Sequence, residues 1–171
     1  ADLIMQPSLV IARRILLRLI SPLIQELLDH LEEHPQMLTE EVIPRLSEAI
    51  DGPDPSLWCV NIYPDETPAL NAYLRQTGPL LLGDVVRDAR DRNLSLDAVP
   101  LMLKRGSARM FMPDGETSLV PGDEILLCST RAAEARVRAN LANAYSLAYL
   151  ATGTDLPRGW LMNRLWQGRA S

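Results

Sequence analysis

The chain has 171 residues, of which 47% are hydrophobic and 23% are charged. This length suits one domain, or one small domain with helical additions, and the composition excludes disordered and fibrous proteins. The formal net charge of -5 argues against nonspecific binding to nucleic acid or to anionic lipid, because both need a basic surface.

The first segment is predicted to form an unusually apolar helix over residues 7–20. Pro7 suits the first helical position, and only Arg13, Arg14 and Arg18 interrupt an otherwise apolar surface. A stripe this wide buries more than one side of a helix. We therefore expect the helix either to thread a core or to pack both on its own domain and on a partner.

Two further helices are expected in the first third of the chain. Ser21 is predicted to cap the earlier one, which should end at His34 because Pro35 follows. Its apolar stripe comprises Leu23, Ile24, Leu27, Leu28 and Leu31. The later helix is expected over residues 37–50, with Thr39 as a candidate cap. Its predicted apolar face comprises Val42, Ile43 and Leu46.

The periodicity changes after a break rich in proline and glycine at residues 51–55. The predicted strands are residues 56–63, 98–104, 108–112 and 124–129. The predicted helices are residues 67–76, 80–92 and 131–141, the last running on towards Leu150 and ending at Gly153. The helix at 80–92 should turn four apolar side chains inward: Leu81, Val85, Val86 and Ala89.

These elements predict an α+β protein. We expect a helical segment at 1–52, to which the resemblance described below assigns crossover and dimerisation roles, and a lobe with a small mixed or antiparallel sheet and helices packed on one face at 56–141. A helical tail at 142–171 follows. Its Trp160 and Trp166 are expected to dock on the domain as a lid or to contact a partner. Because the chain begins without methionine, we expect it to be part of a longer protein.

A metal site receives little support from the sequence. His30 and His34 are the only histidines and lie one helical turn apart, a spacing that can hold zinc. The common metalloprotease pattern places glutamate directly after the first histidine, where this chain has Leu31. Because no third ligand is evident, we interpret the pair as a solvated helix end and expect no metal site.

Catalytic and membrane functions are not expected either. Cys59 and Cys128 lie in apolar runs, which predicts buried reduced thiols of the kind found in cytoplasmic proteins. Both histidines adjoin carboxylates, so neither a Ser-His-Asp nor a Cys-His arrangement is expected. No G-x-G-x-x-G or Walker-type loop occurs, so no cofactor is expected within this chain. No run of about 18 uncharged apolar residues is present to cross a membrane.

Carboxylates gather in the loops of the predicted lobe. The pairs are Asp65-Glu66, Asp114 with Glu116, and Asp123-Glu124. Acidic loops can bind a divalent cation if the fold brings two of them together. Asp-Gly and Gly-Asp are also ordinary turn sequences, which is the simpler interpretation.

One stretch of the lobe resembles a known family. A strand ends in Arg105-Gly106, a short strand leads to Met112-Pro113-Asp114-Gly115, and the turn Pro121-Gly122-Asp123 opens the last apolar strand. At this spacing the pattern resembles the C-terminal lobe (TrkA-C) of the regulator-of-potassium-conductance (RCK) domain.

The first helices extend the resemblance from residue 1 to about residue 140. Residues 1–7, the helix at 8–20 and the helix after Ser21 look like the junction, crossover helix and helix pair that build the dimer in that family. The helix at 37–50, the insert at 67–78 and the tail after Leu141 depart from the family pattern.

The resemblance implies a non-catalytic, cytosolic regulatory domain of a potassium channel or potassium uptake system, at the cytosolic face of the inner membrane. In such proteins a small ligand or ion shifts a domain dimer, which acts on the pore. A Rossmann lobe, which could hold NAD or another nucleotide, and the pore would lie upstream. The alternative is a ligand-binding lobe with another output, such as a cation exchanger, an anion transporter or a transcription regulator.

The resemblance also suggests candidate residues for two surfaces. The ligand would bind between loops of the lobe, where the available groups are Asp65, Glu66, Arg105, Asp114 and Glu116. The homodimer interface would have as its core Leu9, Ala12, Ile15, Leu16, Ile20 and Leu27.

Overall fold

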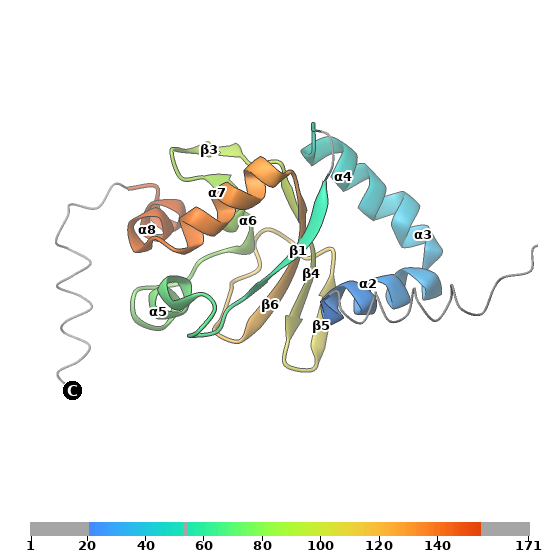
Figure 1. Ribbon diagram of the computed structural model, residues 1–171, viewed down its shortest axis with the longest axis horizontal. Helices are drawn as coiled ribbons and strands as arrows, with labels where there is room; N and C mark the ends of the chain where they lie inside the picture. The colour runs from blue at the N-terminus through green and yellow to red at the C-terminus, as the bar shows by residue number, and fades with distance from the viewer. Residues whose placement is uncertain (1–20, 53–54, 155–171) are drawn as a thin grey trace, which may run out of the picture.

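The computed structural model describes residues 21–52 and 55–154. The predicted helix at 7–20 and the two tryptophans of the tail lie outside the described residues. An antiparallel sheet of four strands, in the order β1-β6-β4-β5, forms the centre of the molecule (Figure 1). Its strands are β1 (Ser56–Asn61), β4 (Ala98–Arg105), β5 (Ala108–Phe111) and β6 (Asp123–Ser129). The α+β class is confirmed.

Strand β6 is buried on both faces of the sheet. Ile125 and Leu127 join one hydrophobic cluster, whereas Leu126 and Cys128 join another, and all four are almost completely buried. Successive side chains of a strand point to opposite faces, so a continuous apolar run is what a strand covered on both sides requires. The apolar sequence of β6 therefore reflects two helical layers.

Helices α5 (Pro68–Gln76), α6 (Leu82–Val85), α7 (Arg131–Leu141) and α8 (Ala144–Thr152) lie on one side of the sheet (Figure 1). The predicted helix from residue 131 breaks at Asn143, whose side chain accepts hydrogen bonds from the N–H groups of Tyr145 and Ser146 and so caps α8. As predicted, Gly153 ends the helix, with a φ of 72°.

The predicted layer of helices on one face of the lobe is thus present, and helices from the N-terminal segment cover the opposite face. They are α2 (Pro22–Glu33), α3 (Pro35–Met37), the π-helical turn η1 (Leu38–Val42) and α4 (Ile43–Ala49). Ser21 caps α2 as predicted, by accepting from the N–H of Leu23 at 3.4 Å. The buried face of α2 packs on β4 and β6 through Leu23, Ile24 and Leu27.

The predicted details of the helix at 37–50 are partly wrong. Helical structure begins at Pro35, and the hydroxyl of Thr39 donates to the carbonyl of Gln36 at 3.0 Å instead of capping. The N–H of Ile43 bonds to the carbonyl of Leu38, five residues back, in a wide turn just before Pro44, which has no N–H to donate. The extra residue in this turn shifts the helix face, which leaves Ile43 48% exposed while Val42 is buried.

The helix predicted at 80–92 is also wrong beyond its first turn. After α6 the chain forms an antiparallel ribbon of β2 (Arg87–Asp88) and β3 (Asp91–Ser95). The Asp88 carboxylate accepts from the N–H of Arg90 at 2.9 Å, and such local bonds offer the backbone an alternative to the helix. The domain division expected at residues 52 and 142 stays a prediction.

Candidate functional site

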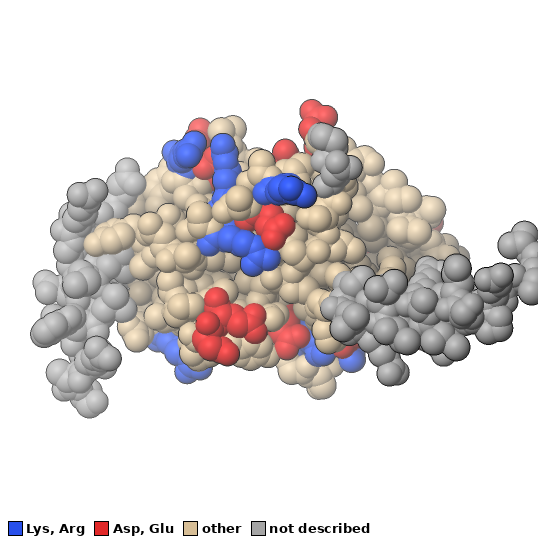
Figure 2. All heavy atoms as spheres, in the orientation of Figure 1, with Lys and Arg blue, Asp and Glu red and all other residues tan. Residues whose placement is uncertain are grey.

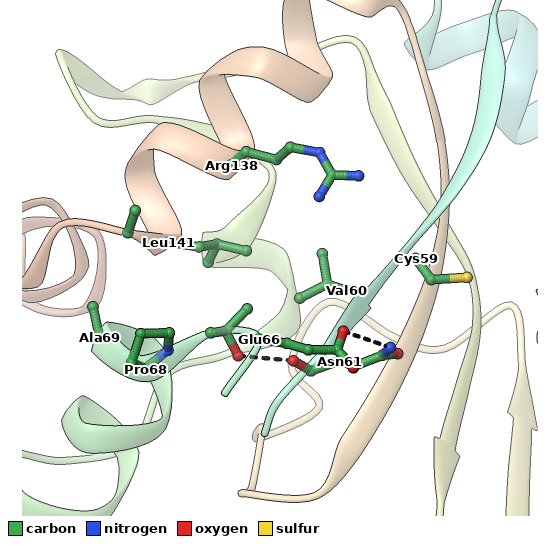
Figure 3. A pocket seen from close by; sticks show the side chains of 10 residues that line it. Cys59, Val60, Asn61, Glu66, Pro68, Ala69, Arg138 and Leu141 are labelled. Carbon is green, nitrogen blue, oxygen red and sulfur yellow. Dashed lines mark hydrogen bonds between the residues drawn. The ribbon is translucent and has the colours of Figure 1, made fainter. Parts of the chain in front are cut away.

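A hollow of about 200 Å³ lies between β1, the start of α5 and the end of α7 (Figure 3). Val60 and Leu141 form part of its apolar lining, and Asn61, Glu66 and Arg138 supply polar groups. Arg138 extends from α7, while Glu66 lies on the other side, in the loop that leads to α5 (Figure 3). An apolar lining with a few polar groups is typical of sites for small molecules.

The charged groups of this hollow are held by neighbours. Arg138 donates to the carboxylate of Glu134 at 2.8 Å, and its guanidinium lies 4.5 Å from the centre of the Trp58 ring. Glu66 accepts from the side-chain amide of Asn61 at 2.8 Å. The same face of the molecule carries basic groups along α7 and a separate acidic group beside the β1–α5 connection (Figure 2). The hollow therefore offers opposite charges on opposite walls.

Cys59 is among the residues at the hollow, but its thiol points away from it, as Figure 3 shows, and is poorly suited to act as a nucleophile. Its thiol donates to the hydroxyl of Ser21 at 3.0 Å, and burial raises the thiol pKa above its ordinary value. Burial raises the pKa of Cys128 in the same way. A thiol whose pKa is raised stays protonated at neutral pH, whereas the thiolate is the reactive form. The prediction of a buried thiol holds for Cys128, and Cys59 is half-buried.

Arg105, one of the predicted ligand residues, is engaged in a structural cluster. Its guanidinium donates to both carboxylate oxygens of Asp123, at 2.7 and 2.8 Å, and to the carbonyl of Ser118 at 2.8 Å. Asp123 is completely buried and also accepts from the N–H of Val120. The bond to Asp123 raises the pKa of Arg105. Arg105 therefore joins the end of β4 to the turn before β6.

The other predicted ligand residues do not share one site. Asp114 and Glu116 are exposed, and the Asp114 carboxylate accepts from the N–H of Glu116 at 2.9 Å, an ordinary turn bond. Gly115 between them lines a different hollow, of about 300 Å³, with Arg45. Of the five candidates only Glu66 lines the smaller hollow. Asp65, its neighbour in sequence, is exposed.

Sequence reasoning missed Arg138, because an arginine in a helix rich in alanine and arginine resembles a solvated surface. The signal that could have found it is spacing: Glu134 precedes Arg138 by four residues, which places an ion pair on one face of α7.

Leu27, the only predicted interface residue that the structure describes, is 3% exposed and packs inside this chain. The rest of the predicted dimer core, from Leu9 to Ile20, lies outside the described residues. The interface stays a prediction.

Comparison with known protein families finds no family model that matches this chain, and a search of curated proteins finds no match. Among the described residues, no helix combines the length and the apolar character needed to cross a membrane.

Proposed function

We propose that this chain is a non-catalytic regulatory domain of the TrkA-C type, which senses a small ligand or ion and couples its binding to the gating of potassium transport. The observation that carries the proposal is the cluster around Asp123. Arg105, at the end of β4, and the Pro121-Gly122-Asp123 turn carry the resemblance to that family, and an ion pair to the buried carboxylate of Asp123 joins them. Residues that are scattered in the sequence pattern thus act together in one structural unit.

The hollow beside Arg138 and Glu66 is our preferred ligand site. Its volume of about 200 Å³ lies below the range of about 300–1,000 Å³ that is usual for drug-sized ligands, which favours an ion or a small polar molecule. Arg138 supplies a positive group for an anionic part of the ligand, and Glu66 supplies a carboxylate for a cationic part. Ligand binding here would change how α7 packs against β1. In the intact protein, a dimer would carry this change to the pore.

A thermal-shift panel tests the sensing role. The ligands are calcium, magnesium, sodium, potassium, adenine nucleotides and cyclic dinucleotides. A ligand at about 100 times its Kd adds about 2.7 kcal/mol to the folded state, which raises Tm by several degrees. We expect one class of ligand to give this shift. A panel without any shift would overturn the sensing role of this lobe.

Variants then locate the site. Arg138→Ala and Glu66→Gln should each remove most of the ligand-induced shift, whereas the matched control Glu116→Gln should leave it intact. The opposite result, with the shift lost in Glu116→Gln and kept in Glu66→Gln, would place the ligand at the loop that contains Asp114. Potassium flux through the intact protein tests the coupling, because Arg138→Ala should abolish the effect of the ligand on flux.

A further inference from the structure

Three potential metal ligands lie together at the carboxyl end of α2. His30, Glu33 and His34 each offer one ligand atom, and these atoms all lie within 4.8 Å of one another. Residues three and four apart in a helix are neighbours on one face, so the helix itself gathers the three side chains. The partial negative charge at a helix carboxyl end also favours a cation there. This cluster is separate from the hollow proposed above as the ligand site.

A backbone hydrogen bond prepares His34 for metal binding. Its Nδ1 lies 3.2 Å from the carbonyl oxygen of His30. A carbonyl oxygen can only accept, so Nδ1 must carry the proton in this bond. In the neutral ring Nε2 is then unprotonated, and its lone pair is free for a metal ion. Metal-ligating histidines in proteins are commonly oriented by such a bond from the other ring nitrogen.

An aromatic contact fixes the ring of His30. This ring stacks on Phe111 of β5, with ring centres 3.6 Å apart and an interplanar angle of 4°. Stacking uses the face of the imidazole, whereas a metal ion binds in the plane of the ring along a nitrogen lone pair. The contact therefore restricts the orientation of His30 without blocking ligation. It also connects the end of α2 to the edge of the sheet.

We propose that His30, Glu33 and His34 bind a divalent transition-metal ion of the zinc class, with at least one coordination position left open. Imidazole and carboxylate ligands suit zinc, whereas calcium and magnesium prefer ligands that are all oxygen. Zinc–ligand distances of about 2.0–2.2 Å in a tetrahedral site place the ligand atoms about 3.3–3.6 Å from one another. The three side chains must therefore close up by about 1 Å, which the exposed side chains of Glu33 and His34 are free to do. The expectation that no metal binds, which rested on the lack of a third ligand, is thereby revised.

The order of residues matches the H-x-x-E-H arrangement of one class of zinc proteases. In helical zinc-protease motifs the two histidines hold the metal and the glutamate acts as a base, so the match supports His30 and His34 as ligands. Glu33 is assigned as the third ligand by its nearness to both histidines. The inference does not depend on the proposed regulatory function. A zinc ion at this position would affect the contact between α2 and β5, because its ligand His30 stacks on Phe111.

Isothermal titration with zinc chloride tests the site, together with the visible spectrum of the cobalt-substituted protein. We expect one ion per chain. His34→Ala and His30→Ala should each weaken zinc affinity by at least tenfold, because even the loss of an outer hydrogen-bonding partner typically costs 10- to 100-fold. Glu33→Gln should also weaken binding, whereas the matched control Glu32→Gln should not. His30 and His34 are the only histidines of the chain, so any histidine ligation can be assigned to them.

His34 is exposed, so His34→Ala should leave the fold intact, which circular dichroism and the urea unfolding midpoint can verify. The proposal is overturned if zinc binds the folded His34→Ala variant as tightly as the original chain, or if millimolar zinc gives no binding to the original chain.

Discussion

Asp123 shows how one buried carboxylate can organise a turn. It is completely buried, and its partners come from the end of β4 and from the residues just before β6. A buried carboxylate is costly unless it is paired and hydrogen-bonded. Because Arg105 donates a hydrogen bond to each of the two carboxylate oxygens of Asp123, Arg105 is better placed to stabilise the turn than to bind a ligand.

Arg105→Ala is therefore expected to destabilise the fold. The substitution removes three hydrogen bonds and leaves the carboxylate of Asp123 with the N–H of Val120 as its remaining described partner. An unpaired buried charge can cost about 3–5 kcal/mol, but the side chain of Arg105 is 42% exposed, so water compensates in part. We expect a loss of about 2 kcal/mol in the free energy of unfolding, measured by urea denaturation.

Arg90→Ala is the matched control, because Arg90 is exposed and its described hydrogen bond uses the backbone N–H. It should change the free energy of unfolding by less than about 0.5 kcal/mol. Equal effects of the two substitutions would show that the contact with Asp123 contributes little to stability.

At the scale of elements, the sequence correctly predicted the start of α7 and the strands β4 and β6, because their hydrophobic periodicity matches the side chains that they bury. The helix predicted from residue 131 begins where α7 begins, with Thr130 as cap and Val137 and Leu141 buried, although its predicted continuation towards Leu150 is broken at Asn143. The strands predicted at 98–104 and 124–129 agree with β4 and β6 within one residue. In these cases capping, periodicity and burial favour the same structure.

The helix predicted at 80–92 failed because tertiary contacts decided its length. Apolar spacing favoured a helix, but Asp84 is buried and lies 3.3 Å from the guanidinium of Arg92, which belongs to β3. That ion pair requires the chain to turn back after α6, because residues 84 and 92 would lie more than two turns apart in a continuous helix.

The candidate site was also only partly predictable from the sequence. Glu66 was found as a loop acid, but its position across the hollow from Arg138 depends on the packing of α7 against β1.

The close contact between α6 and the loop before β6 can be tested through Gly83. The N–H of Gly83 donates to the carbonyl of Gly115 at 2.8 Å, and a Cβ on Gly83 would lie only 3.1 Å from that same oxygen. Alanine is favoured over glycine in helices by about 1 kcal/mol, but overpacking against a rigid backbone costs about 1–3 kcal/mol. We expect Gly83→Ala to lower the free energy of unfolding by about 1 kcal/mol.

Gly78→Ala is the control, because a Cβ at Gly78 meets no atom within 4 Å. This substitution should leave stability unchanged or raise it by about 0.4–1 kcal/mol, by reducing the freedom of the unfolded chain. If Gly83→Ala stabilises the protein as much as Gly78→Ala does, the backbone contact at Gly115 yields easily and does not define the position of α6.

At the scale of the whole molecule, the described chain has three layers, and charged groups help to attach the outer layer that contains α2. Glu26 of α2 forms an ion pair with Lys104 of β4 at 2.8 Å and another with Arg109 of β5. The bond from Arg109, aided by Lys104, lowers the pKa of Glu26 below its ordinary value of 4.5, although burial opposes the shift. One carboxylate thus connects the helical layer to two strands.

The lowered pKa predicts how the attachment depends on pH. The folded state favours the deprotonated carboxylate, so the stabilisation is fully present above the ordinary pKa and is lost as pH falls through the lower pKa of the folded state. Glu26→Gln should lower Tm at pH 7 by roughly 2–4 °C. The difference in Tm between the original chain and the variant should then shrink below about pH 4.5.

Glu32→Gln is the control for loss of charge alone, because Glu32 lies on the same helix but is exposed. A difference that stays constant from pH 7 to pH 3 would mean that the ionised carboxylate of Glu26 does not stabilise the attachment, and that apolar contacts of α2 with the sheet suffice to hold the layer.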